Sequence, residues 1–109
     1  MEFKKVSVPT KGIKIVAEDN GRVVGRASLY LIYNDLHKQP YGLLEDVFVD
    51  EASRGEKLGT KLLEAVMKEA KERGCYKLIG TSRNERNKVH DWYEKIGFKK
   101  YGIEFRMDF

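Results

Sequence analysis

Hydrophobic and polar positions divide the chain into two halves with different periods. In the first half, runs rich in β-branched and aromatic residues are separated by turn residues, a pattern typical of strands. The sequence Asp19-Asn20-Gly21 between two such runs predicts a hairpin, because Asn and Gly tolerate a positive φ. We therefore expect four strands in this half, at residues 3–8, 13–17, 23–33 and 43–49.

Apolar residues of the second half recur at helical spacing instead. Leu58, Leu62 and Val66 share one face of a predicted helix, and Gly74 is placed to end it. A second helix is predicted for residues 87–95, with Gly97 after it and an apolar stripe of Val89, Trp92, Tyr93 and Ile96.

The remaining apolar runs predict three short strands, at residues 77–81, 98–101 and 103–107. The expected order is β-β-β-β-α-β-α-β-β, which indicates an α/β fold with helices packed on a mixed sheet. The strand–helix–strand unit around residues 58–79 implies one parallel pair with a right-handed crossover. A chain of 109 residues is enough for one domain, residues 1–109, and its small core favours association into a homodimer.

The charge balance is basic, with 21 Lys and Arg against 17 Asp and Glu. Such a balance suits nucleic acid, an anionic membrane or a phosphate-bearing small molecule, and it equally suits basic residues dispersed over the surface. The basic segment 57–73 also carries Glu64, Glu69 and Glu72, which is typical of a solvated helix. A nucleic-acid binder needs aromatic residues among exposed Lys and Arg, whereas the aromatic residues here fall on strands and an apolar stripe.

The single cysteine, Cys75, excludes an internal disulfide and favours a reducing compartment. Its place before the apolar pair Leu78-Ile79 favours a buried structural thiol over a nucleophile. No apolar run approaches the about 18 residues of a membrane span, and the N-terminus lacks a signal-peptide core. We therefore expect a cytoplasmic protein. His37 and His90 lie far apart without partners at metal-ligand spacing, so no metal is expected.

The stretch that carries most chemical information is a strand followed by a loop and a long helix. The strand reads Leu44-Glu45-Asp46-Val47-Phe48-Val49-Asp50, and the loop reads Arg54-Gly55-Glu56-Lys57-Leu58-Gly59-Thr60. Unpaired backbone N–H groups and the dipole at a helix start attract phosphate groups. On these grounds alone, the loop is either an anion site or a surface turn.

This loop resembles motif A of the GNAT family of N-acetyltransferases, whose pattern is Arg/Gln-x-x-Gly-x-Gly/Ala. Lys57 departs from the pattern, because the family usually has its first glycine there. A second run resembles motif B, Arg86-x-x-Val89-His90-x-Trp92-Tyr93-Glu94-Lys95-Ile96-Gly97-Phe98. The two runs stand in the family's order, and the resemblance covers residues 13–109. It implies a GNAT-like fold and an acetyl-CoA-dependent N-acetyltransferase.

The resemblance also implies how acetyl-CoA, the co-substrate, would be held. The backbone of Val47, Phe48 and Val49 would pair with the pantetheine arm as with an added strand. The other side of the cofactor would be lined by Asn84, Arg86, Val89 and Ile96, although many relatives have Asn in place of Arg86. The pyrophosphate would be bound by the amides of Arg54, Gly55, Glu56, Lys57, Leu58, Gly59 and Thr60.

Tyr93 matches the family's general acid. A phenol, with a pKa of about 10, stays protonated at neutral pH and can protonate the departing thiolate of coenzyme A. Without the resemblance, Tyr93 would be interpreted as packing against Trp92 and Ile96 on the apolar stripe.

Glu45 is the candidate general base, as in polyamine-type relatives, because an amine must lose a proton before it attacks a thioester. Successive strand residues point to opposite faces, so either Glu45 or Asp46 faces the thioester, and we choose Glu45. The alternative is that Glu45 is an exposed carboxylate or a partner of Arg22 or Arg26. Direct attack would produce an oxyanion, for which a backbone N–H near Val47 or Phe48 is the expected donor.

Most relatives insert one or two helices between their first two strands, where this chain has only residues 9–12. The missing helices leave an open acceptor side, to be filled by the loop at residues 34–41, by a dimer partner or by a large substrate. An open side favours a polypeptide amine or an extended polyamine as acceptor. It also fits the rival interpretation, a non-catalytic sensor or interaction module that binds acetyl-CoA.

Overall fold

The computed structural model describes the backbone of residues 1–109 and every side chain except those of residues 54–56. The chain divides into two compact units, Met1–Ile79 and Gly80–Phe109. The first contains β1 (Lys11–Asp19), β2 (Arg22–Ile32), β3 (Tyr41–Val49), the 3-10 helix η1 (Glu51–Glu56) and helix α1 (Leu58–Glu72). Strand β4 (Leu78–Gly80) follows, and helix α2 (Asn87–Ile96) lies in the second unit.

The strands form one mixed sheet in the order β1-β2-β3-β4. β1 pairs with β2 and β2 pairs with β3, both antiparallel. Asn20 and Gly21 join β1 to β2 with φ values of 51° and 78°, as a two-residue hairpin turn requires. The predicted hairpin and the predicted mixed sheet are therefore confirmed.

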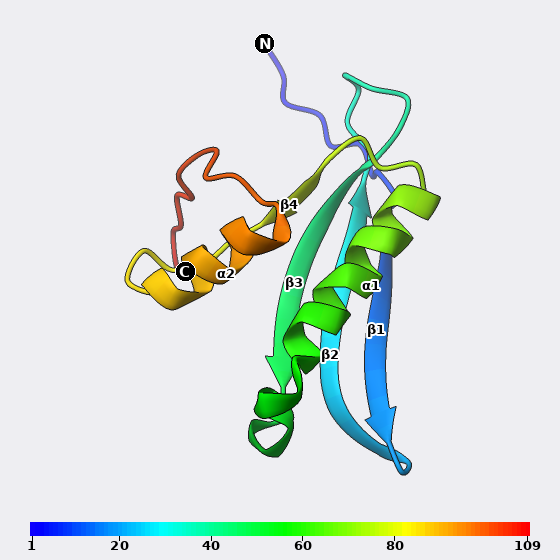
Figure 1. The fold of residues 1–109 in the computed structure, drawn as a ribbon. Coiled ribbons are helices and arrows are strands. Elements are labelled where there is room, and N and C mark those ends of the chain that lie inside the picture. Colours follow the sequence, from blue (N-terminus) through cyan, green and yellow to red (C-terminus); the bar gives the residue numbers. More distant parts are fainter. The chain divides into compact units, whose positions relative to one another are not determined.

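The core of the first unit lies between α1 and one face of the sheet. Leu62, Leu63 and Val66 of α1 are buried there, and so are Ala27 and Leu29 of β2. Figure 1 shows α1 crossing β1, β2 and β3 after η1 has turned the chain back from the end of β3. The close approach of α1 needs glycine in β2: a Cβ at position 25 would lie 2.8 Å from Cδ1 of Leu62 and 3.2 Å from the carbonyl oxygen of Phe48.

The second unit is built around α2, which ends as predicted at Gly97. This glycine adopts a φ of 126°, and the N–H of Phe98 donates to the carbonyl of Tyr93 at 3.0 Å. The predicted apolar stripe is half-buried along its length, with no fully buried member, and consists of Val89, Trp92, Tyr93 and Ile96.

Three predicted strands are wrong. Residues 3–8, 98–101 and 103–107 form no strand, and apolar side chains among them are exposed, Phe3 by 90% and Phe105 by 92%. Alternation gives a segment two different faces, but a strand also needs a neighbour that pairs with its backbone. The predicted order is therefore wrong at both ends: the observed order of strands and α-helices is β-β-β-α-β-α.

Candidate active site

A β-bulge interrupts β3 at Asp46. Ser28 of β2 pairs with Glu45, and Arg26 pairs with Phe48, so Asp46 and Val47 together lie opposite Ala27. Asp46 accommodates the extra residue with a φ of 54°, in the left-handed region that Asp tolerates better than most residues. The bulge shifts the alternation of side chains along the rest of β3.

Because of the bulge, Glu45 and Asp46 both lie toward the face of the sheet opposite α1. Glu45 pairs with Ser28, and Asp46 forms an ion pair with Arg26, which is two residues from Ser28 and therefore on the same face. The expectation that the two carboxylates point to opposite faces is wrong, since it assumed an unbroken strand.

The two carboxylates differ in what they contact. Nε of Arg26 donates to Oδ2 of Asp46 at 3.0 Å, and Nη2 donates to Oδ1 at 3.3 Å. These hydrogen bonds lower the pKa of Asp46, and the charges of Arg26 and Lys14 add to the effect. Arg22 instead pairs with Asp50 at 3.0 Å. Glu45, which is exposed, has neither arginine as its partner and makes no ion pair with any side chain that the structure describes.

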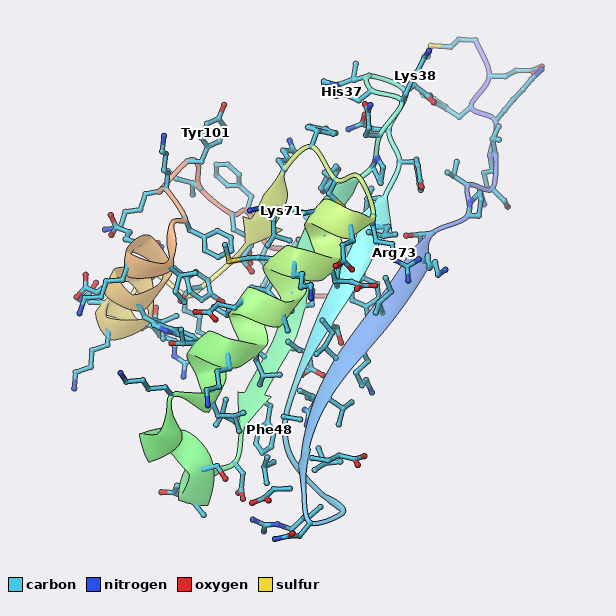
Figure 2. The ribbon with its side chains drawn as sticks, turned by 45° about the vertical axis from the view of Figure 1, so that its right-hand side comes forward. His37, Lys38, Phe48, Lys71, Arg73 and Tyr101 are labelled. Carbon is cyan, nitrogen blue, oxygen red and sulfur yellow. The ribbon has the colours of Figure 1, made fainter. Side chains whose placement is uncertain are left out.

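Beyond the bulge, β3 ends with Val47, Phe48 and Val49, the residues expected to pair with pantetheine. Val47 and Val49 are half-buried, and Phe48 is exposed near the end of the strand, as Figure 2 shows. β4 has three residues against nine in β3, and the N–H of Gly42, near the start of β3, donates to the carbonyl of Lys77 at 2.9 Å. The hydrogen bond between Gly42 and Lys77 thus lies at the start of β3, whereas the bulge at Asp46 lies toward its end.

A second residue in the left-handed region lies at the junction of η1 and α1. Lys57 has a φ of 58° and a ψ of 25°, a left-handed conformation that favours glycine. Glycine adopts this conformation without strain, which explains why the GNAT pattern usually has its first glycine at the position of Lys57. The first turn of α1 carries no acidic residue, so no carboxylate within that turn offsets the positive end of the helix dipole, and Lys57 makes no side-chain cap hydrogen bond.

The other predicted pyrophosphate ligands fall into two sets. The half-buried residues Leu58, Gly59 and Thr60 form the first turn of α1, as expected. The side chains of Arg54, Gly55 and Glu56 lie outside the described residues.

The remaining predicted site residues belong to the second unit. Tyr93 lies on α2 with its ring centroid 5.6 Å from that of Trp92 and 5.2 Å from that of Phe98. Arg86 precedes α2, and its carbonyl accepts from the N–H groups of Val89 and His90, each at 3.1 Å. Asn84 is exposed, and Ile96 is half-buried at the end of the helix. The structure thus groups Tyr93, Arg86 and Val89 on one helix and its entry.

The surroundings of Cys75 and of His90 explain these two residues without a catalytic role. Burial raises the pKa of the Cys75 thiol, which disfavours a nucleophilic thiolate. Nε2 of His90 lies 2.8 Å from the carbonyl of Arg83, where it ties the preceding loop to α2. Among the described residues, no group of three or more His, Cys, Asp and Glu side chains is arranged to hold a metal ion. No described helix is both long and apolar enough to cross a membrane.

The sequence named Arg26 only as a possible partner of Glu45, and its pairing with Asp46 was missed. The sequence contains features that could have indicated this pairing. Glu45 and Asp46 are two adjacent acidic residues inside an apolar strand, and the neighbouring strand carries an arginine. Adjacent acidic residues in such a strand indicate a break in alternation, and an arginine opposite them is a suitable partner.

Comparison with known proteins places this geometry among acetyltransferases. The sequence profile of the acetyltransferase (GNAT) family matches residues 3–98. Glucosamine 6-phosphate N-acetyltransferase of Trypanosoma brucei brucei is 35% identical over 92 residues, which are 84% of this chain and 60% of that protein. The chain therefore spans less than two thirds of that relative's length.

Solved structures include chains of similar fold. The crystal structure of glucosamine-6-phosphate N-acetyltransferase from Arabidopsis thaliana is 34% identical, with a TM-score of 0.79 over 90% of this chain and 67% of that one. A transcriptional regulator from Bacillus halodurans C-125 is 27% identical, with a TM-score of 0.84 over 90% of this chain and 66% of that one.

Proposed function

This chain belongs to the acetyltransferase (GNAT) family, and we propose on that basis that it transfers an acetyl group from acetyl-CoA to the amine of an acceptor. The observation that carries the proposal is the bulged end of β3, which leads through η1 into the start of α1, whose first turn carries no acidic residue. Backbone at the bulge and N–H groups at the helix start supply the two kinds of contact that a coenzyme A thioester needs.

The cofactor would lie along the end of β3. Val47, Phe48 and Val49 would pair with the pantetheine arm, and the first turn of α1 would bind the pyrophosphate. The absence of an acidic residue from that first turn supports this placement, because an Asp or Glu there would compete with a phosphate. Lys57 is exposed at the same helix start and adds a positive charge. Asn84, Arg86, Val89 and Ile96 remain candidates for the cofactor's other side.

Glu45 is the proposed general base. A general base needs a carboxylate that is open to solvent and not committed to a cation, and Glu45 meets both conditions. Asp46 meets them less well, because its pKa is lowered by Arg26 and a weaker base accepts a proton less readily. Glu45 would take a proton from the ammonium group of the acceptor, directly or through a water molecule.

Transfer would then proceed by direct attack. The amine nitrogen forms a bond to the thioester carbonyl carbon, and a backbone N–H near Val47 or Phe48 stabilises the oxyanion. The carbon–sulfur bond then breaks, the sulfur leaves as the thiolate of coenzyme A, and the Tyr93 phenol donates a proton to it. The nitrogen, which carries a surplus proton after the attack, releases it to the Tyr93 phenolate and so restores the phenol. The products are an acetylated amine and free coenzyme A.

The first acceptor to test is glucosamine 6-phosphate, which is the substrate named for the trypanosomal and plant relatives. The net charge of +4 suits an anionic acceptor of this kind. A polyamine or a peptide amine is the alternative acceptor.

The experiment is calorimetric titration with acetyl-CoA, followed by an assay of thiol release with glucosamine 6-phosphate, spermidine and a lysine peptide. We expect micromolar binding and amine-dependent release, which Tyr93→Phe lowers about a hundredfold, the lower limit usual for a general acid. Tyr101→Phe is the matched control, since Tyr101 is 98% exposed and lies in the same unit. Failure to bind acetyl-CoA would contradict the proposal.

A second function, binding of acetyl-CoA without transfer, is favoured by one observation. A chain of similar fold from Bacillus halodurans is described as a transcriptional regulator. Acetyl-CoA binding without thiol release for any of the three amines would support this second function.

A further inference from the structure

We propose that Arg26 is a positioning residue for acetyl transfer, because it holds the bulge of β3 in shape through Asp46 and Phe48. The inference rests on the proposed function and adds a residue to it that lies on β2, outside both family motifs. Arg26 would not touch the substrate. Its role would be to fix the backbone of Val47, which lies between its two contacts.

The contacts of Arg26 fix two points of β3. Two hydrogen bonds, of 3.0 and 3.3 Å, join its guanidinium group to both carboxylate oxygens of Asp46. The guanidinium carbon also lies 4.8 Å from the centroid of the Phe48 ring. A planar guanidinium is suited to both contacts at once, whereas the point charge of lysine is not. Arg26 therefore connects the residues immediately before and after Val47.

The bulge needs such support because its conformation is unfavourable for the chain. A residue with a side chain is strained at a φ of 54°, so Asp46 tends to return to the extended conformation. A return to regular pairing would reverse the faces of all later residues in β3. The ion pair with Arg26 opposes this change, since it forms only when Asp46 lies toward the face that carries Arg26.

The consequence for catalysis follows from geometry. A donor that stabilises the oxyanion must lie within hydrogen-bond distance of it, and a misplacement of about 1 Å can lower the rate about a hundredfold. Loss of Arg26 should therefore reduce kcat by between about tenfold and a hundredfold. Glycine at position 46 adopts a positive φ without strain, so it should make the support of Arg26 unnecessary.

The test compares four variants in the thiol-release assay. We expect Arg26→Ala to lose at least about tenfold in kcat, and Asp46→Gly to stay within about twofold of the native chain. The double variant Arg26→Ala/Asp46→Gly should match Asp46→Gly. A role in stability alone would leave kcat of the folded Arg26→Ala chain unchanged. Arg22→Ala is the matched control: it removes the other ion pair of β2, with Asp50, and should leave kcat unchanged within about twofold.

The outcomes separate this inference from the proposed function. Native kcat in Arg26→Ala would overturn the inference and leave the function standing, and an inactive Asp46→Gly would overturn it by giving the Asp46 carboxylate a direct role. If the native chain transfers no acetyl group, amide hydrogen exchange still tests the positioning role. Faster exchange at residues 46–48 in Arg26→Ala but not in Arg22→Ala would support it, and equal exchange in both variants would overturn it.

Discussion

The two halves of β3 differ in regularity and in what they present. Leu43 and Leu44 in the first half keep regular pairing with Tyr30 and Leu29, and Leu44 is 3% exposed in the core. The second half contains the bulge at Asp46, and the side chains of Glu45, Asp46 and Phe48 in it are exposed. Regular alternation buries one face of a strand. A β-bulge interrupts that alternation, so polar side chains and backbone groups near it can face a ligand. The first half therefore packs in the core, and we infer that the second half belongs to the proposed acetyl-CoA site.

Glu45→Gln is expected to have the largest effect on this comparison. A general base contributes at least about a hundredfold, so kcat should fall by that factor or more while the fold is retained. Thiol-release kinetics measure the loss. Glu18→Gln is the matched control, an exposed glutamate at the end of β1. A variant with native kcat would remove Glu45 from the mechanism.

Leu44→Ala tests the other half of the strand. The change should destabilise the chain by about 2–5 kcal/mol, because it leaves a cavity where a fully packed side chain was. Urea unfolding measures the stability, and kcat of the folded fraction should be unchanged. Leu36→Ala is the control, since Leu36 is 83% exposed and should not affect stability. Equal losses in both variants would contradict the packing role of Leu44.

The difference between these halves also sets what could be predicted from the sequence. The hairpin at Asn20-Gly21, strands β2 and β3 and both helices were predicted with their ends within two residues, because turn residues and helical spacing act locally. The terminal strands were wrong, because alternation at residues 103–107 does not show whether a partner strand is available.

The candidate site was predicted only in part, because some of its features depend on contacts between strands and not on local sequence. The motif residues followed from local pattern and resemblance, but the shared face of Glu45 and Asp46 depends on a positive φ that alternation does not reveal. Arg26 was named from the sequence as a possible partner of Glu45, but its pairing with Asp46 and its contact with Phe48 became apparent only from the structure. The roles of Glu45, Tyr93 and the cofactor ligands stay predictions until the variants are measured.

Lys57→Gly extends the comparison to the junction after β3. Glycine relieves the strain of the left-handed conformation, so the variant should be as stable as the native chain or more stable by up to about 1 kcal/mol. Lys61→Gly inside α1 is the control and should lose about 1 kcal/mol. Chemical denaturation distinguishes the two signs, and a similar loss in both variants would contradict the left-handed conformation of Lys57.

The pH dependence of the Arg26–Asp46 pair should give the smallest effect. The folded pKa of Asp46 lies below its unfolded value, so the pair stabilises the chain above that unfolded value, about 3.9. The stabilisation is lost as the pH falls through the folded pKa. Asp46→Asn should therefore have a lower Tm than the native chain at pH 7, and the difference should shrink below about pH 4. A difference that is constant with pH would exclude the ion pair as its cause.

The central claim is that the bulged half of β3 and the start of α1 form the acetyl-CoA site. The most direct test is an amide NMR titration of the chain with acetyl-CoA. We expect the largest shifts at Val47, Phe48 and Val49 and at residues 57–60, with little change at residues 41–44 of the same strand. Shifts concentrated at residues 41–44, or no shift at the bulged end under saturating acetyl-CoA, would contradict the claim.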